Sequence, residues 1–302
     1  MQTKVVKIDS ANIDDAAMKE ACDLIRAGEL VAFPTETVYG LGADALHPEA
    51  SKKIYAAKGR PSDNPLIVHI SKFEDLVSIA REVPPQAKKL ADAFWPGPLT
   101  MIVWKNDRVP YETTGGMDTV AIRMPKHPVA LRLIEGSGCL IAAPSANTSG
   151  KPSPTEASHV ALDMDGRIPM ILDGGPVGIG IESTIVDLSE ETPMILRPGY
   201  ITQEMLQEVL GEKVCMDPGI IASDSTRKPK APGMKYRHYA PKAPVTVVRG
   251  DPDKTAAYIA AHLGEQTGVM CFDEYRDRFP GCVVECFGSK ADLGTQAREV
   301  FD

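Results

Sequence analysis

The feature that most constrains the fold is the alternation of short apolar segments with amphipathic segments along the first 211 residues. In residues 14–27, for example, Ala17, Ala21 and Ile25 fall on one face of a helix. Further helices are predicted at residues 49–57, 129–134 and 202–211. Strands are predicted at residues 30–33, 66–70, 99–104, 119–123, 140–143, 170–172, 183–188 and 194–197. This alternation indicates an α/β layer fold, and the clustering of strands after residue 165 favours a mixed sheet.

The composition excludes several classes of protein. A chain of 302 residues suggests about two domains. Its 33 Lys and Arg residues against 41 Asp and Glu residues give a net charge of −8, so the whole molecule is not a basic nucleic-acid binder. It has no run of about 18 apolar residues that would suit a membrane span, and residues 1–10 lack the apolar core of a signal peptide. Six cysteines without a CxxC pair indicate reduced thiols, so we expect a cytoplasmic protein.

Three regions are predicted. We expect residues 1–211 to form the main α/β domain and residues 212–243 to form a linker or lid. The linker has few large apolar residues and a basic stretch without acidic residues between Arg227 and Lys242. In residues 244–302, strands at 245–248, 269–272 and 283–287 and a helix at 255–263 predict the start of a small Rossmann-like domain. This domain is short for its type, so we expect it to be incomplete.

Four polar clusters follow the predicted strands and helices, where α/β folds place ligands. They are residues 34–40, residues 58–65, residues 143–151, and residues 181–184 with 197–199. Arg60, Arg123 and Arg197 lie at separate ends of these elements among Ser and Thr hydroxyls. Guanidinium groups combined with hydroxyls suit a triphosphate or a carboxylate. We therefore predict that the three guanidinium groups converge on a single hollow.

Taken singly, most of these residues also have a purely structural interpretation. Lys58 and Arg60 suit a solvated helix end, and His69 suits a core position on a strand. Ser153, with Glu156 three residues later, has the pattern of a helix N-cap. Arg123 is different, because a charge on an apolar strand must be paired or must hold an anion.

Several common catalytic motifs are absent from the sequence. The loop at Ser145 lacks the Walker spacing, since Ser stands where Gly is required and Lys151 precedes Pro152. No GxGxxG, GxSxG or HExxH motif is present. Covalent serine catalysis and zinc hydrolysis are therefore poorly supported.

A series of ordered motifs resembles the YrdC family. The motifs are PTETVYGLG, KGRPSDNPLIVHI, FWPGPLT, TVAIRMP, APSANTSGKPS, IESTIVDL and ILRPG, and they span about residues 13–210. The later segment APGMKYRHYAP resembles the two-domain branch of that family. The resemblance implies a twisted mixed sheet with a concave positive face flanked by helices, plus a small Rossmann-like C-terminal domain. It also implies ATP-dependent synthesis of threonylcarbamoyl-AMP from L-threonine and bicarbonate or CO2, with release of pyrophosphate.

The same resemblance implies the roles of particular residues. The residues implied to bind L-threonine are Thr37, His69, Arg123, Ala143 and Ser183. Those implied to bind ATP are Lys58, Arg60, Asn64, Thr119, Ser145, Ser153 and Arg197, with His238 or Tyr239 of the linker closing over the nucleotide. No covalent intermediate is expected, so Lys58, Arg60 and Arg123 would act by positioning the reactants. Mg2+ is expected with ATP, and a threonylcarbamoyl transferase and tRNA are the expected downstream partners.

Two alternatives remain open at this point. The first is an RNA-binding module that uses the concave basic face and the basic linker, with at most weak RNA binding. The net charge of −8 argues against it. The second is an accessory domain of a carbamoyltransferase, which the absence of CxxC pairs disfavours.

Overall fold

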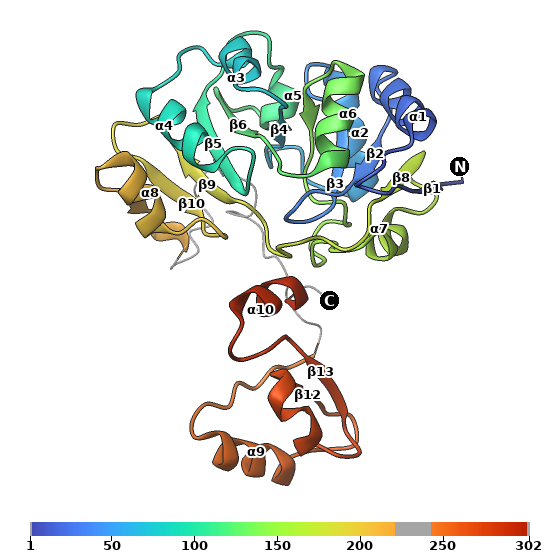
Figure 1. Ribbon diagram of the computed structural model, residues 1–302, viewed down its shortest axis with the longest axis vertical. Coiled ribbons are helices and arrows are strands. Elements are labelled where there is room, and N and C mark those ends of the chain that lie inside the picture. Colours follow the sequence, from blue (N-terminus) through green and yellow to red (C-terminus); the bar gives the residue numbers. More distant parts are fainter. Residues whose placement is uncertain (1, 221–242, 301–302) are drawn as a thin grey trace.

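The computed structural model describes residues 2–220 and 243–300. Within them the main body is built on an eleven-stranded sheet in the order β1-β8-β2-β3-β7-β4-β6-β5-β9-β10-β11 (Figure 1). The strands are β1 (Lys4–Lys7), β2 (Val31–Phe33), β3 (Gly40–Asp44), β4 (Ile67–His69), β5 (Leu99–Trp104), β6 (Thr119–Arg123), β7 (Ile141–Ala142), β8 (Met170–Asp173), β9 (Thr184–Asp187), β10 (Met194–Arg197) and β11 (Cys215–Met216). β11 pairs with β10, so the sheet continues past residue 211.

Helices flank this sheet. They are α1 (Asp15–Arg26), α2 (Pro48–Lys58), α3 (Phe73–Ile79), α4 (Pro85–Phe94), α5 (Tyr111–Thr114), α6 (Pro128–Ser137), α7 (Ala157–Met164) and α8 (Gln203–Leu210), followed by the short 3-10 helix η1 (Pro218–Ile220). Local signals set several of their ends. Asp14 caps α1, while Thr202 caps α8 and Gly211 ends it in the left-handed conformation. In the described parts of the chain, no helix combines the length and the apolarity needed to cross a bilayer.

The sheet is mixed, as the sequence predicts. β4 pairs in parallel with β6, whereas β5 pairs antiparallel with β6 and parallel with β9. In the β4–β6 pair His69 is the register partner of Arg123, so two predicted site residues end neighbouring strands. The fold class predicted from the sequence is confirmed.

Alternation along the strands divides the core into layers. In β2, Val31 and Phe33 pack with α1 and α6, whereas Ala32 belongs to the larger core beneath α2 and α4. On β4, β6 and β9, the side chains of Ile67, Ala121 and Ile185 form a separate small cluster. His69 and Arg123 are two residues further along β4 and β6 than members of this cluster, so they project from the same face.

The C-terminal unit is small. It contains α9 (Pro252–Ala261), β12 (Gly268–Cys271), the 3-10 helix η2 (Asp273–Arg278), β13 (Val283–Cys286) and α10 (Leu293–Glu299), and Figure 1 shows it in orange to red. β12 and β13 pair in parallel, as in a doubly wound fold. The predicted strand at residues 245–248 is wrong. Val245 and Val247 are exposed, and no described strand pairs with that segment.

β3 was not predicted as a strand, because its sequence GLGAD has two glycines and no β-branched residue. It lies between β2 and β7, where Gly42 permits close packing. A Cβ atom on Gly42 would lie 2.7 Å from the ring of Phe33 and 2.8 Å from Cγ2 of Ile141. The absence of a side chain is therefore what allows this strand to fit.

We predict that Gly42→Ala lowers the free energy of unfolding of the main body by about 1–3 kcal/mol, because the added methyl overpacks the core. Denaturant unfolding followed by tryptophan fluorescence measures this, since both tryptophans, Trp95 and Trp104, lie in the main body. Gly178→Ala is the control, because its Cβ atom would meet only an atom 4.0 Å away. Equal stability of the two variants would contradict the prediction.

Candidate active site

A cavity opens beside the ends of β4 and β6. Its volume is about 290 Å³, close to the lower end of the range for ligand pockets, and it opens to solvent. It is lined by Thr35, Thr37, Val38, Gly40, Lys58, Arg60, Ile67, His69, Arg123, Ala143, Pro144, Ser145, Asn147, Ser149, Gly150, Glu182, Ser183, Arg197 and Pro198. All four polar clusters of the sequence contribute to it.

The three guanidinium groups predicted to converge do so. Arg60 follows α2, Arg123 ends β6 and Arg197 ends β10, and all three line the cavity. Arg60 donates from Nε to the carbonyl of Asn64 (3.2 Å) and from Nη2 to the carbonyl of Pro65 (3.0 Å). The cavity therefore concentrates positive charge in a molecule whose net charge is −8.

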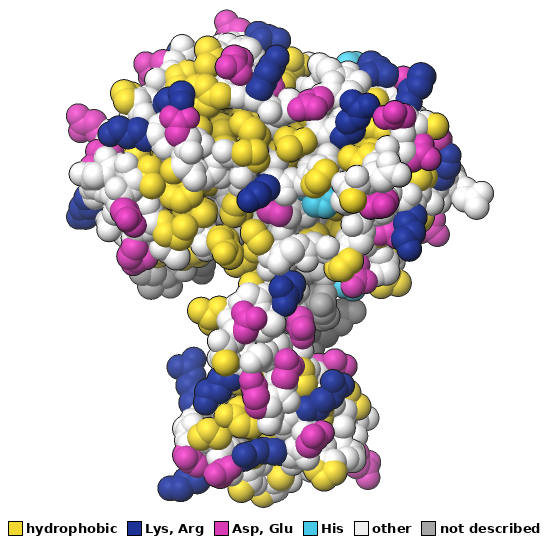
Figure 2. Space-filling model, in the orientation of Figure 1, with side chains coloured by type: hydrophobic (Ala, Val, Ile, Leu, Met, Phe, Trp, Pro, Cys, Tyr) yellow, Lys and Arg dark blue, Asp and Glu magenta, His cyan; other side chains and the backbone are white. Residues whose placement is uncertain are grey.

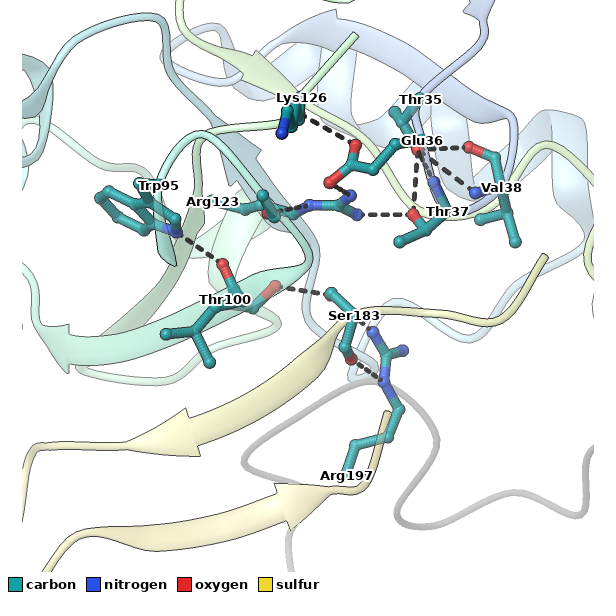
Figure 3. A network of polar contacts seen from close by, with 12 residues as sticks. Thr35, Glu36, Thr37, Val38, Trp95, Thr100, Arg123, Lys126, Ser183 and Arg197 are labelled. Atoms are coloured by element: carbon teal, nitrogen blue, oxygen red, sulfur yellow. Dashed lines mark hydrogen bonds and ion pairs between the residues drawn. The ribbon is translucent and has the colours of Figure 1, made fainter. Parts of the chain in front are cut away.

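Arg123 is buried and held from several sides. Its Nε donates to the carbonyl of Gly97 (3.3 Å) and its Nη1 donates to Oγ1 of Thr37 (2.8 Å). Its Nη2 lies 2.7 Å from Oε1 of Glu36, and the other carboxylate oxygen of Glu36 accepts a hydrogen bond from the backbone N–H of Lys126 (3.0 Å). Figure 3 shows Glu36 and Thr37 both reaching this guanidinium. The buried positive charge is thus paired, as the sequence argument requires.

The loop between β2 and β3 is fixed by its own hydroxyl groups. Oγ1 of Thr35 donates to the carbonyl of Val38 (2.7 Å) and accepts from the backbone N–H groups of Thr37 and Val38 (both 3.2 Å). It also lies 2.9 Å from Oγ1 of Thr37. Thr35 therefore stabilises the turn, as one interpretation of the sequence predicts. The same turn holds Thr37 at the cavity wall.

Lys58 is the last residue of α2 and is almost fully buried. Gly59 follows it in the left-handed conformation and turns the chain toward Arg60. The Nζ of Lys58 donates to the carbonyls of Ser145 and Asn147. Burial, reinforced by the charge of Arg60, holds the pKa of this ammonium well below its usual value. The solvated helix end considered from the sequence is therefore wrong for Lys58, which instead ties α2 to the loop after β7.

His69 ends β4 inside the cavity wall. Its Nδ1 lies 3.2 Å from the carbonyl of Ile67, and its ring meets that of Phe33 edge to face. Burial, and secondarily the charge of Arg123, lower the pKa of His69 to about 3. The imidazole is therefore neutral at physiological pH and adds no positive charge beside Arg123.

Arg197 and Ser183 form a second polar contact across the cavity from Arg123 (Figure 3). Arg197 donates from Nε to the carbonyl of Ser183 (3.0 Å) and from Nη2 to its hydroxyl (3.1 Å). The hydroxyl of Ser183 also lies 2.7 Å from that of Thr100 in β5. These contacts link β5, β9 and β10 at the cavity rim.

Ser153 is not a helix cap. Glu156 is the N-cap residue of α7 and makes no side-chain cap bond, while the hydroxyl of Ser153 donates to Oε1 of Glu182 (2.6 Å). The capping pattern read from the sequence is therefore wrong, because this hydroxyl finds a carboxylate that lies 29 residues further along the chain. Glu182 is the only acidic side chain among the described residues that line the cavity.

The structure brings together most of the site residues named from the sequence. Those that line the cavity are Thr37, Lys58, Arg60, His69, Arg123, Ala143, Ser145, Ser183 and Arg197. Asn64 and Thr119 are buried outside the lining, and Ser153 reaches it through Glu182. His238 and Tyr239 lie outside the described residues. Sequence reasoning passed over Glu36, Asn147 and Glu182, although each belongs to one of the quoted motifs.

Comparisons with known proteins cover almost all of the chain. A family profile named Sua5_yciO_yrdC and described as telomere recombination matches residues 23–199, and the C-terminal domain profile of threonylcarbamoyl-AMP synthase matches residues 201–302. The threonylcarbamoyl-AMP synthase of Bacillus subtilis (strain 168) is 49% identical over 297 residues, which cover 97% of this chain and 85% of that protein. That of Pyrococcus abyssi is 56% identical over 269 residues, covering 87% of this chain and 78% of that protein.

A solved structure extends this similarity to both parts of the chain. The crystal structure of P. abyssi Sua5 in complex with L-threonine superimposes with a TM-score of 0.89 at 47% identity. The match covers 99% of this chain and 87% of that one. Two-domain architecture is therefore shared with that protein.

The pKa of His69 predicts an acid-dependent loss of stability. The unfolded chain binds a proton below about pH 6.5, whereas folded His69 stays neutral down to about pH 3. Its contribution to stability is therefore fully present above pH 6.5 and is lost as the pH falls toward 3. We expect the wild type to lose about 2 kcal/mol more of its unfolding free energy between pH 7 and pH 5 than His69→Gln does. His262→Gln, at an exposed histidine, is the control and should behave as the wild type.

Proposed function

Because the chain belongs to the Sua5–YciO–YrdC family, we propose that it makes threonylcarbamoyl-AMP from L-threonine, bicarbonate or CO2, and ATP, and releases pyrophosphate. It is then a nucleotidyltransferase, since it transfers an adenylyl group to a carbamate. The observation that carries this proposal is the convergence of Arg60, Arg123 and Arg197 with buried Lys58 on one cavity. Such a cavity suits a triphosphate beside a small carboxylate.

The amino-acid end of the cavity is formed by Thr37, His69, Arg123 and Ala143. Nη2 of Arg123 carries two N–H groups, and Oε1 of Glu36, 2.7 Å away, can occupy only one of them. It therefore retains an N–H donor for the carboxylate of L-threonine, which is the kind of anion that a guanidinium binds best. Neutral His69 and the hydroxyl of Ser183 would complete the threonine site.

The nucleotide end is formed by Lys58, Arg60, Ser145 and Arg197. Two guanidinium groups can balance part of the negative charge of a triphosphate, and a bound triphosphate would favour the charged form of buried Lys58. Asn64, Thr119 and Ser153 are buried. Their ATP-binding roles, like the lid role of His238 or Tyr239, remain proposals from the family resemblance.

The proposed reaction needs no covalent intermediate. The amine of L-threonine attacks CO2, loses a proton and becomes a carbamate. A carbamate oxygen then attacks the α-phosphorus of ATP, the bond to the bridging oxygen breaks, and pyrophosphate leaves. Arg123 would hold the amino acid while Lys58, Arg60 and Arg197 stabilise charge on the phosphates, so positioning and electrostatics supply the rate.

Mg2+ is proposed to enter with ATP. Among the described residues no group of three or more His, Cys, Asp or Glu side chains could hold a metal ion. Mg2+ with nucleotides is usually bound by one or two carboxylates together with phosphates. Glu182 supplies a carboxylate of this kind in the cavity lining, oriented by Ser153. The residues therefore fit a metal carried by the triphosphate, where it would screen the phosphate charge.

The product would pass to a threonylcarbamoyl transferase for modification of tRNA, a step that belongs to the cytoplasm. The alternative of an RNA-binding module is not favoured. On the face shown in Figure 2, Lys and Arg side chains are interspersed with Asp and Glu instead of forming a broad basic patch. The clustered cations lie inside the cavity, where they suit a small ligand.

The proposal predicts that pyrophosphate is released from ATP only when L-threonine and bicarbonate are both present. A coupled pyrophosphate assay with each substrate omitted in turn measures this. Release that continues at the same rate without threonine would show a different reaction, because the amino acid supplies the nucleophile.

The two ends of the cavity predict that two arginine variants impair the binding of different substrates. Arg123→Ala should raise KM for threonine and Arg60→Ala should raise KM for ATP, each lowering kcat/KM by roughly 10²-fold or more. Steady-state kinetics with one substrate varied at a time separates them. Arg108→Ala, at an exposed arginine outside the cavity lining, is the control. If both site variants raised the same KM, the division into two ends would be wrong.

A further inference from the structure

The contact between Arg123 and Glu36 is a buried ion pair at the amino-acid end of the cavity. The side chain of Arg123 is 5% exposed and that of Glu36 is 11% exposed. The two come from distant segments, since Arg123 ends β6 and Glu36 lies in the loop between β2 and β3. Glu36 is not itself in the cavity lining, so it stands behind Arg123 as seen from the cavity.

The geometry of this pair leaves hydrogen-bonding capacity unused. Nη2 of Arg123 and Oε1 of Glu36 are 2.7 Å apart, yet neither atom forms an aligned hydrogen bond. The pair interacts by charge at 2.7 Å, and at least one of the two N–H groups of Nη2 remains for another acceptor. Buried donors are normally satisfied, so this one indicates a ligand on the cavity side.

We propose that Glu36 is a positioning residue that fixes Arg123 and neutralises its charge, so that the subsite selects a zwitterionic amino acid over a carboxylate that lacks an amine. This inference rests on the proposed function, because it concerns the binding of the L-threonine carboxylate by Arg123.

The charges around the subsite support this selection. Arg123 is positive, Glu36 is negative, and His69 is neutral because burial lowers its pKa to about 3. An unpaired guanidinium would attract any carboxylate and repel the ammonium group of an amino acid. With Glu36 in contact, the pair is neutral overall, so a bound zwitterion leaves no net charge there. A simple carboxylate would instead add one negative charge that the neutral Arg123–Glu36 pair does not compensate.

The position of Glu36 is itself fixed. Oε2 of Glu36 accepts a hydrogen bond from the backbone N–H of Lys126. The backbone carbonyl of Glu36 accepts another from the backbone N–H of Ile179 (2.8 Å). The burial of nearby His127 lowers the pKa of that imidazole, so it adds no positive charge beside Glu36. Glu36 is thus anchored through its carboxylate by Lys126 and through its backbone by Ile179.

The test compares L-threonine with 3-hydroxybutyrate, which has the same hydroxyl and carboxylate but no amine. Titration calorimetry on the full chain gives both dissociation constants. For the wild type we expect L-threonine to bind at least about tenfold more tightly than 3-hydroxybutyrate, which corresponds to about 1.4 kcal/mol of binding free energy. Glu36→Gln should reduce this ratio to about threefold or less, mainly by strengthening the relative binding of 3-hydroxybutyrate.

Two further variants serve as controls for the effect of the Glu36 charge. Glu36→Asp keeps the charge and should keep the ratio, even if both ligands bind more weakly. Glu49→Gln removes a carboxylate from the exposed pair with Lys52 and should leave both constants unchanged. If Glu36→Gln does not fold, the wild type and Glu36→Asp still decide, because loss of the ratio in Glu36→Asp would contradict a charge effect.

The outcomes distinguish the proposed role of Glu36 from the proposed function of the site. Equal binding of both ligands by the wild type would overturn the inference, and so would parallel weakening of both ligands in Glu36→Gln, which is what a merely structural role produces. Absence of any threonine binding by the wild type would instead count against the proposed function of the site.

Discussion

The buried guanidinium of Arg123 is the interaction on which the site depends. An unpaired charge in this position would cost several kcal/mol, so its partners are not optional. Those partners come from two separate parts of the chain, namely the carbonyl of Gly97 in one loop and the carboxylate of Glu36 with the hydroxyl of Thr37 in another. Satisfying one charge therefore fixes the loop before β5, the loop between β2 and β3, and the end of β6 relative to one another.

The rest of the cavity follows the same arrangement, in which the ends of helices and strands supply charge and neighbouring loops supply acceptors. Lys58 is held by carbonyls of the loop after β7, and Arg197 is held by Ser183 before β9. Each cation is thus oriented before any ligand arrives. Preorganised charges of this kind lose little energy to rearrangement during a reaction, which suits a condensation that proceeds without a covalent intermediate.

Much of this could be predicted from the sequence, and the exceptions have physical causes. Continuous apolar runs predict β4, β5 and β6, because the side chains of these strands are buried on both faces. They miss β3, whose glycines carry no pattern but fit against Phe33. Ser153 has the spacing of a capping box, yet its hydroxyl bonds to Glu182, since local motifs cannot register a partner that only the tertiary fold supplies. Glu36 escaped notice for the same reason, because its pairing with Arg123 spans 87 positions of sequence.

The wide separation in sequence of the four loops that meet at the cavity has a thermodynamic consequence. No fragment of the main body contains the whole site, so a ligand that fills it can bind only the complete fold. Its binding energy is then added to the cooperative stability of all eleven strands in the described main body, by about 2.7 kcal/mol at a hundredfold excess over the dissociation constant. Occupancy of the site would thus set how long the entire sheet resists opening.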